Sequence, residues 1–397
     1  MPKLLIVTTV AATLRAFLLP YARHFRELGW RVDALSRDAS SCAECQEAFD
    51  ACHEVPFTRK PWALRGVRRM NSAIRSLVLR ERYDIVHVHT PVASFVTRMA
   101  LSRLPAEQRP KIVYTAHGFH FHSGGSPLKN RLYLGLERRA ARWTDHLIVI
   151  NEEDRRAALQ HGLVPPEKLS RLPGIGLDLE RWSRGSVSVS GVRGLCEELG
   201  IEQGDELFLM VAEFNPGKRH RDALEALAKT GRRDFHLALA GRGPLEDTMK
   251  ALAEKLGISR QVHFLGQRSD IPLLMLASRA TILPSEREGL NRSVMESLAL
   301  GIPVLGADVR GIRDLITDPS QGELYPAGNP AALAAAMLVA AASPSRFHPR
   351  PDPCWSLDHL LKEHEALYGR LLRESNGVLP PFRGGTITDR RQFLSGY

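Results

Sequence analysis

Cysteine is scarce in this sequence. The 397-residue chain contains five, Cys42, Cys45, Cys52, Cys196 and Cys354. An odd number spread over a long chain argues against a disulfide framework and fits a reducing compartment. The Cys42–Cys45 spacing, with Cys52 and His53 nearby, is one that zinc sites use, but no second paired cluster follows at zinc-finger spacing. We therefore expect no structural metal here.

Long apolar runs are also missing. No stretch is long and apolar enough for a transmembrane helix, and no fixed-period repeat indicates a solenoid. The apolar N-terminal residues, Lys3–Val10, are rich in β-branched side chains and lead into a helical pattern rather than a signal-peptide cleavage site. These absences favour a cytoplasmic globular protein whose first strand lies within Lys3–Val10.

Acidic residues are absent from one stretch, Arg59–Arg80, which carries seven basic residues. Residues 1–180 contain 27 Lys and Arg against 18 Asp and Glu, whereas residues 181–397 contain 27 and 26. The Arg59–Arg80 segment also has apolar side chains at helical spacing. It could therefore lie peripherally on an anionic membrane surface or pack its apolar face on a sheet, and the two are compatible. Nucleic acid is disfavoured as a partner, because no nucleic-acid-binding motif accompanies the charge.

Apolar runs alternate with helical patterns along most of the chain. The runs predict ten strands: Leu4–Thr9, Arg31–Leu35, Ile85–His89, Ile112–Thr115, His146–Ile150, Leu207–Ala212, His236–Ala240, Val262–Leu265, Ala280–Leu283 and Pro303–Gly306. This alternation is typical of parallel, doubly wound sheets. We therefore expect an α/β protein with two Rossmann-like domains that face a cleft.

The expected domain limits follow from changes in composition. We place an N-terminal domain at 1–172, a Gly-, Ser- and Arg-rich linker at 173–204 and a C-terminal domain at 205–350. Residues 351–373 have a helical pattern compatible with a return to the N-terminal domain, and residues 374–397 are expected to form an irregular tail. Ligands of open α/β sheets bind at the carboxyl ends of the strands, so the loops of both domains would line the cleft.

The most informative segment lies between residues 283 and 305. An apolar run ends there at Leu283, a loop follows, and Ser293 with Glu296 has the spacing of a capping box for a helix that stops before Gly301. Glu288 precedes this helix and Glu296 lies on it. The backbone N–H groups of residues 289–292 would then face an anion such as a diphosphate.

This segment resembles the GT-B fold glycosyltransferases of family 4, which are retaining enzymes that use nucleotide sugars. The likeness rests on Glu288-x7-Glu296 in the setting Glu-Gly-Leu-Asn-Arg-Ser-Val-Met-Glu, followed by Gly-Ile-Pro-Val, and covers about residues 1–373. It implies that Glu288 reaches the donor sugar near the reaction centre and that Glu296 accepts hydrogen bonds from the ribose hydroxyls. It also places the backbone of Gly289, Leu290, Asn291 and Arg292 against the diphosphate or the sugar.

A second element of the resemblance follows the first strand of the C-terminal half. Lys218 matches the family's lysine on the donor phosphates, where a cation offsets the charge of the leaving diphosphate. Glu213 stands where the family commonly has arginine, and we expect Arg219, Arg242 or Arg292 to substitute for it.

Three glycines complete the donor site that the resemblance implies. Gly241 and Gly243 belong to a glycine-rich turn beside the phosphates, and Gly266 to a turn that meets the nucleobase.

The N-terminal half contributes His117 to the resemblance, since it matches a histidine that contacts the donor sugar. His120 and His122 follow closely, but no Asp-x-Asp pair accompanies them, and enzymes of this type need no metal. We interpret those two as loop or acceptor-side residues, and His87 and His89 as structural residues of a strand. The loop at 9–15 lacks the paired glycines that many relatives have there.

These residues predict a retaining glycosyltransferase without metal or cofactor. It would move a hexose or N-acetylhexosamine from a UDP-sugar to a membrane-associated, polyprenyl-diphosphate-linked glycan, for capsule or exopolysaccharide synthesis. His117 and Glu288 would act at the reaction centre. Two alternatives are an isomerase like UDP-N-acetylglucosamine 2-epimerase, which needs no acceptor, and a non-catalytic nucleotide-sugar-binding protein, for which Glu213 is the best support.

Overall fold

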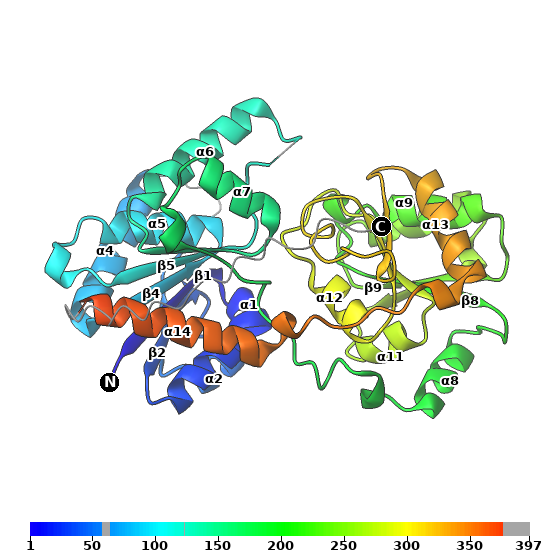
Figure 1. Ribbon diagram of the computed structural model, residues 1–397, viewed down its shortest axis with the longest axis horizontal. Helices are drawn as coiled ribbons and strands as arrows, with labels where there is room; N and C mark the ends of the chain where they lie inside the picture. Colours follow the sequence, from blue (N-terminus) through cyan, green and yellow to red (C-terminus); the bar gives the residue numbers. More distant parts are fainter. Residues whose placement is uncertain (58–63, 123, 376–397) are drawn as a thin grey trace, which may run out of the picture.

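Two parallel sheets organise the chain in the computed structural model, which describes residues 1–57, 64–122 and 124–375. Figure 1 shows the two sheets in separate domains that lie side by side. The N-terminal sheet has seven strands in the order β3-β2-β1-β4-β5-β6-β7. These are β1 (Lys3–Val10), β2 (Arg31–Arg37), β3 (Ala51–Glu54), β4 (Ile85–His89), β5 (Lys111–Ala116), β6 (His146–Val149) and β7 (Leu169–Arg171). All its strand pairs are parallel.

The C-terminal sheet has six parallel strands in the order β10-β9-β8-β11-β12-β13. They are β8 (Glu206–Val211), β9 (Phe235–Ala240), β10 (Val262–Gly266), β11 (Ala280–Leu283), β12 (Val304–Ala307) and β13 (Gly322–Tyr325). In each sheet the strand order reverses at one place, between β1 and β4 and between β8 and β11. Loops that leave the strands at such a switch point form a ligand crevice.

Helices cover both faces of the N-terminal sheet. They are α1 (Ala11–Thr13), a π-helical turn at Leu14–Leu18, α2 (Leu19–Glu27), α3 (Ala43–Ala48), α4 (Leu64–Glu81), α5 (Pro91–Leu101), α6 (Pro127–Ala141) and α7 (Glu152–Gln160). Alternate residues of β1 face opposite layers: Leu5 and Val7 pack with α4 and α5, whereas Leu4 and Ile6 pack with α2 and α3. A strand buried on both faces has to be apolar throughout, which is why its run was recognisable in the sequence.

The C-terminal sheet is covered in the same way. Its helices are α8 (Val189–Glu198), α9 (His220–Thr230), α10 (Glu246–Lys255), α11 (Ile271–Leu276), α12 (Arg292–Ala299) and α13 (Pro330–Ala342). The last helix, α14 (Leu357–Ser375), returns to the N-terminal domain (Figure 1), where Leu360 and Tyr368 pack in one core with Phe25. The expected α/β architecture of two Rossmann-like domains is confirmed.

Two features differ from the expectations. The segment 173–204 is not only a linker: α8 forms inside it, capped by the Ser188 side chain, and Leu195 is buried in the C-terminal core. The edge strands β3, β7 and β13 were not predicted, because they have only three or four residues each and little apolar patterning.

The basic segment contributes its apolar face to the core. In α4, Met70, Ile74, Leu77 and Val78 are buried against the sheet, while Arg68 and Arg69 are exposed. Residues 58–63 of this segment and residues 376–397 of the expected tail lie outside the described residues. Within the described part of the chain, no helix has the length and apolar character to cross a bilayer.

Candidate active site

The switch point of the C-terminal sheet brings Lys218 and Glu288 together. Lys218 follows β8 and Glu288 follows β11, the two strands between which the order reverses. Lys218 Nζ lies 2.6 Å from Glu288 Oε1. The Asn215 side chain accepts a hydrogen bond from the backbone N–H of Lys218 and holds this turn. The two residues that the sequence assigned to the phosphates and the sugar are thus neighbours at the expected edge of the sheet.

Helix α12 begins after the loop that carries Glu288, but not as expected. Its N-cap is Asn291, whose side chain accepts a hydrogen bond from Val294 N at 3.1 Å; the predicted cap at Ser293 is wrong. The hydroxyl of Ser293 instead donates to Asn291 Oδ1. An Asn caps a helix as well as a Ser does, and the cap lies two residues earlier than expected.

Glu296 lies on the first turns of α12 and is buried. Its Oε1 accepts a hydrogen bond from Arg292 Nε at 2.8 Å. Burial nevertheless raises the pKa of Glu296 to about 7, while Arg292 acts in the opposite direction. When the pKa of a carboxyl group lies near neutral pH, a ligand that donates hydrogen bonds to the carboxylate changes how much of it is ionised.

A cavity of about 390 Å³ lies between the two domains and contains both proposed reaction-centre residues. Glu288–Arg292 line it from the C-terminal domain, His117 and Thr90 line it from the N-terminal domain, and Gly174–Leu177 line it from the connecting segment. The backbones meet closely beside it: a Cβ added to Gly289 would lie 2.2 Å from the carbonyl oxygen of His117. Residues 172 positions apart therefore share one site.

The chain after β1 supplies a part of the cavity that the sequence did not indicate. Where many relatives have paired glycines, this chain runs directly into α1 and the π-helical turn, and Thr13, Phe17 and Leu18 line the cavity. Single π-helical turns are frequent at functional sites. A run of ordinary helix-forming residues carries no signal for such a turn, so it was missed.

An ion pair joins the N-terminal and C-terminal domains beside the cavity. Arg310 Nη1 donates to Asp154 Oδ1 at 2.8 Å and Arg310 Nε donates to the carbonyl of Glu288 at 3.1 Å. Both charged side chains are almost fully buried. The Asn151 side chain also donates to the carbonyl of Gly289 at 3.1 Å. Burial raises the pKa of Asp154, and Arg310 opposes that rise. The two contacts between the domains were not predicted, because they join residues 156 and 138 positions apart.

The arginines expected to replace the one missing at Glu213 have different surroundings. Arg219 is bound to Asp222 and Glu286, at 2.7 and 2.9 Å, which leaves its guanidinium engaged with carboxylates. Arg242 lies against Gly266. Arg292 is paired with Glu296, as described above. The Asn215 amide donates to Glu213 itself.

The three glycines beside the expected nucleotide position are required by the backbone, two by close approaches and one by its conformation. A Cβ on Gly241 would lie 2.1 Å from the carbonyl oxygen of Ala212, and one on Gly243 would lie 2.6 Å from that of Phe214. Gly266 has a φ of 62°, in the left-handed region that favours glycine. The turns after β8, β9 and β10 therefore pack tightly at one edge of the sheet.

His120 and His122 lie away from His117. The ring of His120 packs against Tyr133, and His122 lines a separate cavity of about 920 Å³ between α6, α7 and residues 310–317. His89, interpreted as structural, is in contact with His117: its Nδ1 lies 3.1 Å from His117 Nε2.

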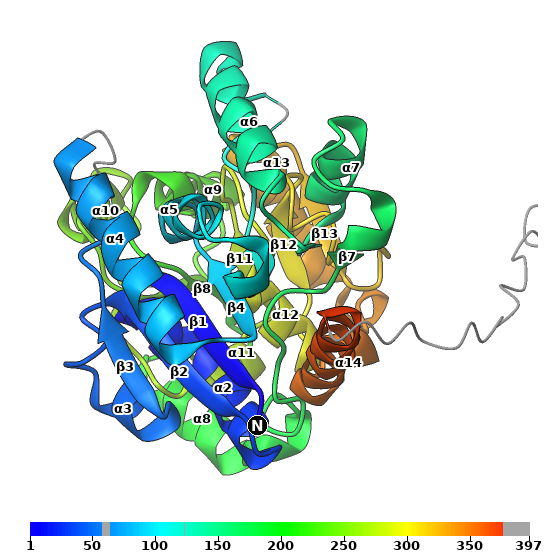
Figure 2. The same ribbon diagram turned by 90° about the vertical axis from the view of Figure 1, so that its left-hand side faces the viewer.

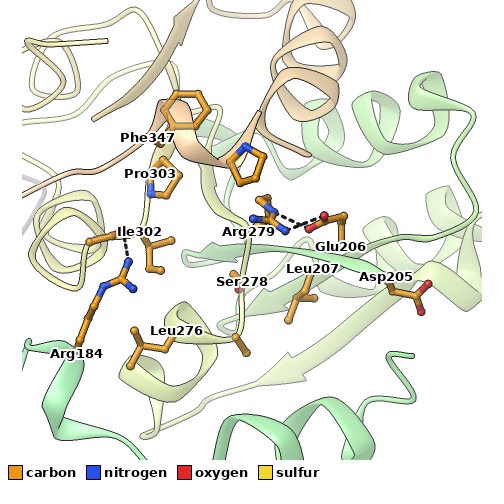
Figure 3. Close-up of a pocket in the computed structure, with 13 residues that line it drawn as sticks. Arg184, Asp205, Glu206, Leu207, Leu276, Ser278, Arg279, Ile302, Pro303 and Phe347 are labelled. Carbon is orange, nitrogen blue, oxygen red and sulfur yellow. Dashed lines mark hydrogen bonds and ion pairs between the residues drawn. The ribbon is translucent and has the colours of Figure 1, made fainter. Parts of the chain in front are cut away.

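A further cavity lies at the opposite end of the C-terminal sheet. Figure 3 shows it beside the ion pair of Arg279 and Glu206, whose two contacts measure 2.6 and 2.9 Å. Glu206 begins β8, and Arg279 directly precedes β11. This is the amino edge of the strands, whereas ligands of open α/β sheets bind at the carboxyl edge. The interdomain cavity is therefore the candidate active site.

The sequence matches two protein families in consecutive parts. Residues 17–181 match "Glycosyltransferase Family 4" and residues 195–346 match "Glycosyl transferases group 1". A relative named "Putative glycosyltransferase EpsD", from Bacillus subtilis (strain 168), is 35% identical over 337 residues, which is 84% of this chain and 85% of the relative. The chain belongs to the GT-B fold glycosyltransferases of family 4.

Two other similar proteins are of interest. An Escherichia coli protein named UDP-Gal:alpha-D-GlcNAc-diphosphoundecaprenol alpha-1,3-galactosyltransferase is 29% identical over 265 residues, 65% of this chain and 67% of the relative. The crystal structure of Anabaena Alr3699/HepE in complex with UDP and glucose superimposes with a TM-score of 0.71 at 20% identity, covering 96% of this chain and 100% of the other. The latter likeness concerns the fold.

Proposed function

We propose that this protein is a retaining glycosyltransferase that moves a hexose or N-acetylhexosamine from a UDP-sugar to a hydroxyl of a polyprenyl-diphosphate-linked glycan. The observation that carries the proposal is the single cavity in which His117 of one domain and Glu288 of the other meet, with Lys218 beside Glu288. The name of the Escherichia coli relative, which specifies a UDP-sugar donor and a diphosphoundecaprenol-linked acceptor, supports the proposed substrates.

The donor would be held by charge and by hydrogen bonds from the C-terminal domain. Lys218 would exchange Glu288 for the diphosphate, and the backbone N–H groups that precede α12 would donate to the same phosphates. Glu288, released from Lys218, would accept hydrogen bonds from the sugar hydroxyls. These cations and dipoles stabilise the negative charge that develops on the leaving nucleoside diphosphate.

Retention is supported by the lack of a strong base at the cavity. Among the described residues that line it, Glu288 is the one carboxylate, and in the proposed complex it is occupied by the hydroxyls of the donor sugar. Burial lowers the pKa of His117 to about 4, so its neutral ring is a weak base at pH 7. In the proposed step the acceptor oxygen bonds to the anomeric carbon as the bond to the leaving phosphate oxygen breaks. The acceptor proton passes to that phosphate on the same face of the sugar.

The acceptor would be reached from an anionic membrane surface. Because Met70, Ile74, Leu77 and Val78 of α4 are buried, the described part of the basic segment offers mainly charge, through residues such as Arg68 and Arg69. Helix α6, which stands out from the N-terminal domain in Figure 2, adds Leu128 and Leu132, 80% and 50% exposed, on a helix rich in basic side chains. Apolar and basic side chains together are typical of helices that bind anionic lipids peripherally.

The proposal is tested by measuring nucleoside diphosphate release from UDP-, GDP- and ADP-sugars, with and without a polyprenyl-diphosphate-linked sugar. We expect release from a UDP-sugar that depends on the acceptor, and a product whose anomeric configuration by NMR matches that of the donor. An inverted product would refute retention. Lys218→Ala should lower the rate of release about 100- to 1,000-fold, whereas Lys255→Ala, on the exposed end of α10, should leave it unchanged.

The same assay separates the two alternatives. An epimerase would convert the sugar of the donor without an acceptor and without releasing the nucleotide. A non-catalytic protein would bind the donor and leave it unchanged, which would agree with Glu213 in place of the usual arginine. For the membrane, we expect flotation with phosphatidylglycerol vesicles at low salt. That binding should be lost in a Leu128→Ser, Leu132→Ser variant, and vesicles without anionic lipid serve as the control.

A further inference from the structure

His89 occupies a constrained position behind His117. It ends β4, is 3% exposed and places Nδ1 at 3.1 Å from His117 Nε2. The two rings are stacked, with centroids 5.3 Å apart and planes inclined by 25°. The other nitrogen of His89, Nε2, is buried and has no hydrogen-bond partner. The lack of a partner for Nε2 indicates which of the two histidines donates the hydrogen bond between them.

Both rings carry a single N–H at neutral pH. Burial lowers the pKa of His117 to about 4 and holds the pKa of His89 well below its ordinary 6.5. In a neutral imidazole one nitrogen donates and the other accepts, so the contact between the rings has two possible directions.

The two directions of this hydrogen bond differ in whether His89 Nε2 carries a proton. If His117 Nε2–H donated to His89 Nδ1, the proton of His89 would have to be on Nε2, as a buried N–H without a partner. If His89 Nδ1–H donates, Nε2 carries only an unused lone pair. Unpaired buried N–H groups are rarer in proteins than unpaired acceptors, so the second arrangement is favoured.

The neighbouring histidine of the stack lacks this constraint. The His87 ring lies beside that of His89, with centroids 4.1 Å apart and planes inclined by 35°. Its two nitrogens face the hydroxyls of Tyr368 and Thr115, at 2.5 and 2.7 Å. Because a hydroxyl can donate or accept, either tautomer of His87 is satisfied. The tautomer of His117 therefore depends on His89 alone within this stack.

We infer that His89 is a positioning residue that donates from Nδ1–H to His117 Nε2 and thereby holds His117 with its proton on Nδ1. In that form the ring has one nitrogen occupied and offers a hydrogen-bond donor to an oxygen in the cavity. His117 then orients a hydroxyl or ring oxygen of the sugar by donation. The role in turnover rests on the proposed function, whereas the tautomer itself does not.

The test measures the tautomer directly by NMR of the full-length protein with ring-¹⁵N-labelled histidine. The His117 signals are assigned by their loss in His117→Gln. We expect a protonated Nδ1 and an unprotonated Nε2 for His117 in the unmodified protein. A protonated Nε2 would overturn the inference whatever the activity. The tautomer is measured in the unmodified protein, and the His117→Gln variant serves only to assign the signals.

Substitutions at His89 test whether the His117 tautomer affects the rate of transfer. His89→Leu removes the donor, so we expect the His117 tautomer to change and kcat to fall about 10- to 100-fold, as for other outer partners of functional histidines, with little change in the donor KM. His89→Asn keeps an amide N–H near the position of Nδ1 and should restore both the tautomer and most of kcat. Loss of kcat in His89→Leu without rescue by Asn would indicate a merely structural role and contradict the inference.

His364→Leu is the matched control. It removes another buried imidazole of the same cluster, whose Nδ1 donates to Leu360 O in its own helix, and should leave the His117 tautomer unchanged. If the native tautomer is as expected but no donor supports transfer, the proposed function fails and the assignment of His89 stands.

Discussion

A single methyl group added at Gly289 tests whether activity depends on the distance between the two domains. A Cβ at this position would lie 2.2 Å from the carbonyl oxygen of His117, whereas ordinary contact begins at 3.4 Å. The two backbones would therefore have to part by about 1.2 Å, the difference between these distances. A misplacement of about 1 Å at a reaction centre costs on the order of 100-fold in rate.

We expect Gly289→Ala to lower kcat about 100-fold, which corresponds to about 2.7 kcal/mol of transition-state stabilisation. The methyl group would also lie 3.2 Å from Ile150 Cδ1, and Gly289 O accepts a hydrogen bond from Asn151 across the same boundary, so we expect a lower melting temperature as well as a lower kcat. The assay is nucleoside diphosphate release at saturating donor and acceptor. Gly135→Ala, on α6 with nothing within 4 Å of the added Cβ, should retain full activity.

Turnover of Gly289→Ala at the unmodified rate would contradict this prediction. The close approach of Gly289 to His117 would then not determine the geometry of the site, and the domains would have to adopt another arrangement during turnover.

Three further predictions concern charged residues. Lys218→Ala should lower kcat about 100- to 1,000-fold, as the loss of one stabilising donor does at other charged transition states, and pre-steady-state measurement of the bond-breaking step should show the same loss. Arg310→Met leaves Asp154 buried without its cation and should lower the free energy of unfolding in urea by about 3–5 kcal/mol; an unchanged urea midpoint would show that the interdomain pair contributes no stability. Glu296, with its pKa near 7, should bind the ribose as a carboxylate, so donor affinity by calorimetry should rise about tenfold from pH 6 to pH 8 and be flat in Glu296→Gln. The stability effect has the opposite sign: the folded protein keeps a proton that the unfolded chain loses near pH 4.5, so Glu296 lowers stability as pH rises from 4.5 through 7.

Sequence patterns predicted the strands and helices whose formation depends mainly on their own residues. The buried strands β1, β4 and β8 could be recognised because a strand covered on both faces is mostly apolar. The short edge strands, such as β3 and β7, could not, since their pairing depends on a neighbouring strand and not on their own residues. The cap of α12 was displaced to Asn291 because Asn and Ser are both good caps, and their order in the chain does not decide between them.

Some residues of the candidate site could be predicted from the sequence and others could not. Glu288 and Glu296 could be proposed together because they lie on one loop and the helix that follows it. Their roles stay predictions until a donor is tested. The partners of the site were beyond the sequence: Arg310 pairs with Asp154 across 156 positions, and nothing near either residue indicates the other.

The class of fold, the family and the residues of the C-terminal loops follow from the sequence alone, because periodicity and motif spacing are properties of neighbouring residues. The fold in three dimensions was needed to show that the His117 carbonyl meets Gly289, that Arg310 pairs with Asp154 across the domain boundary and that His89 contacts His117 while its other nitrogen has no partner. These contacts arise from the packing of two separately folded sheets and from burial. Both change pKa values and hydrogen-bond directions in ways that a residue's neighbours along the chain do not specify.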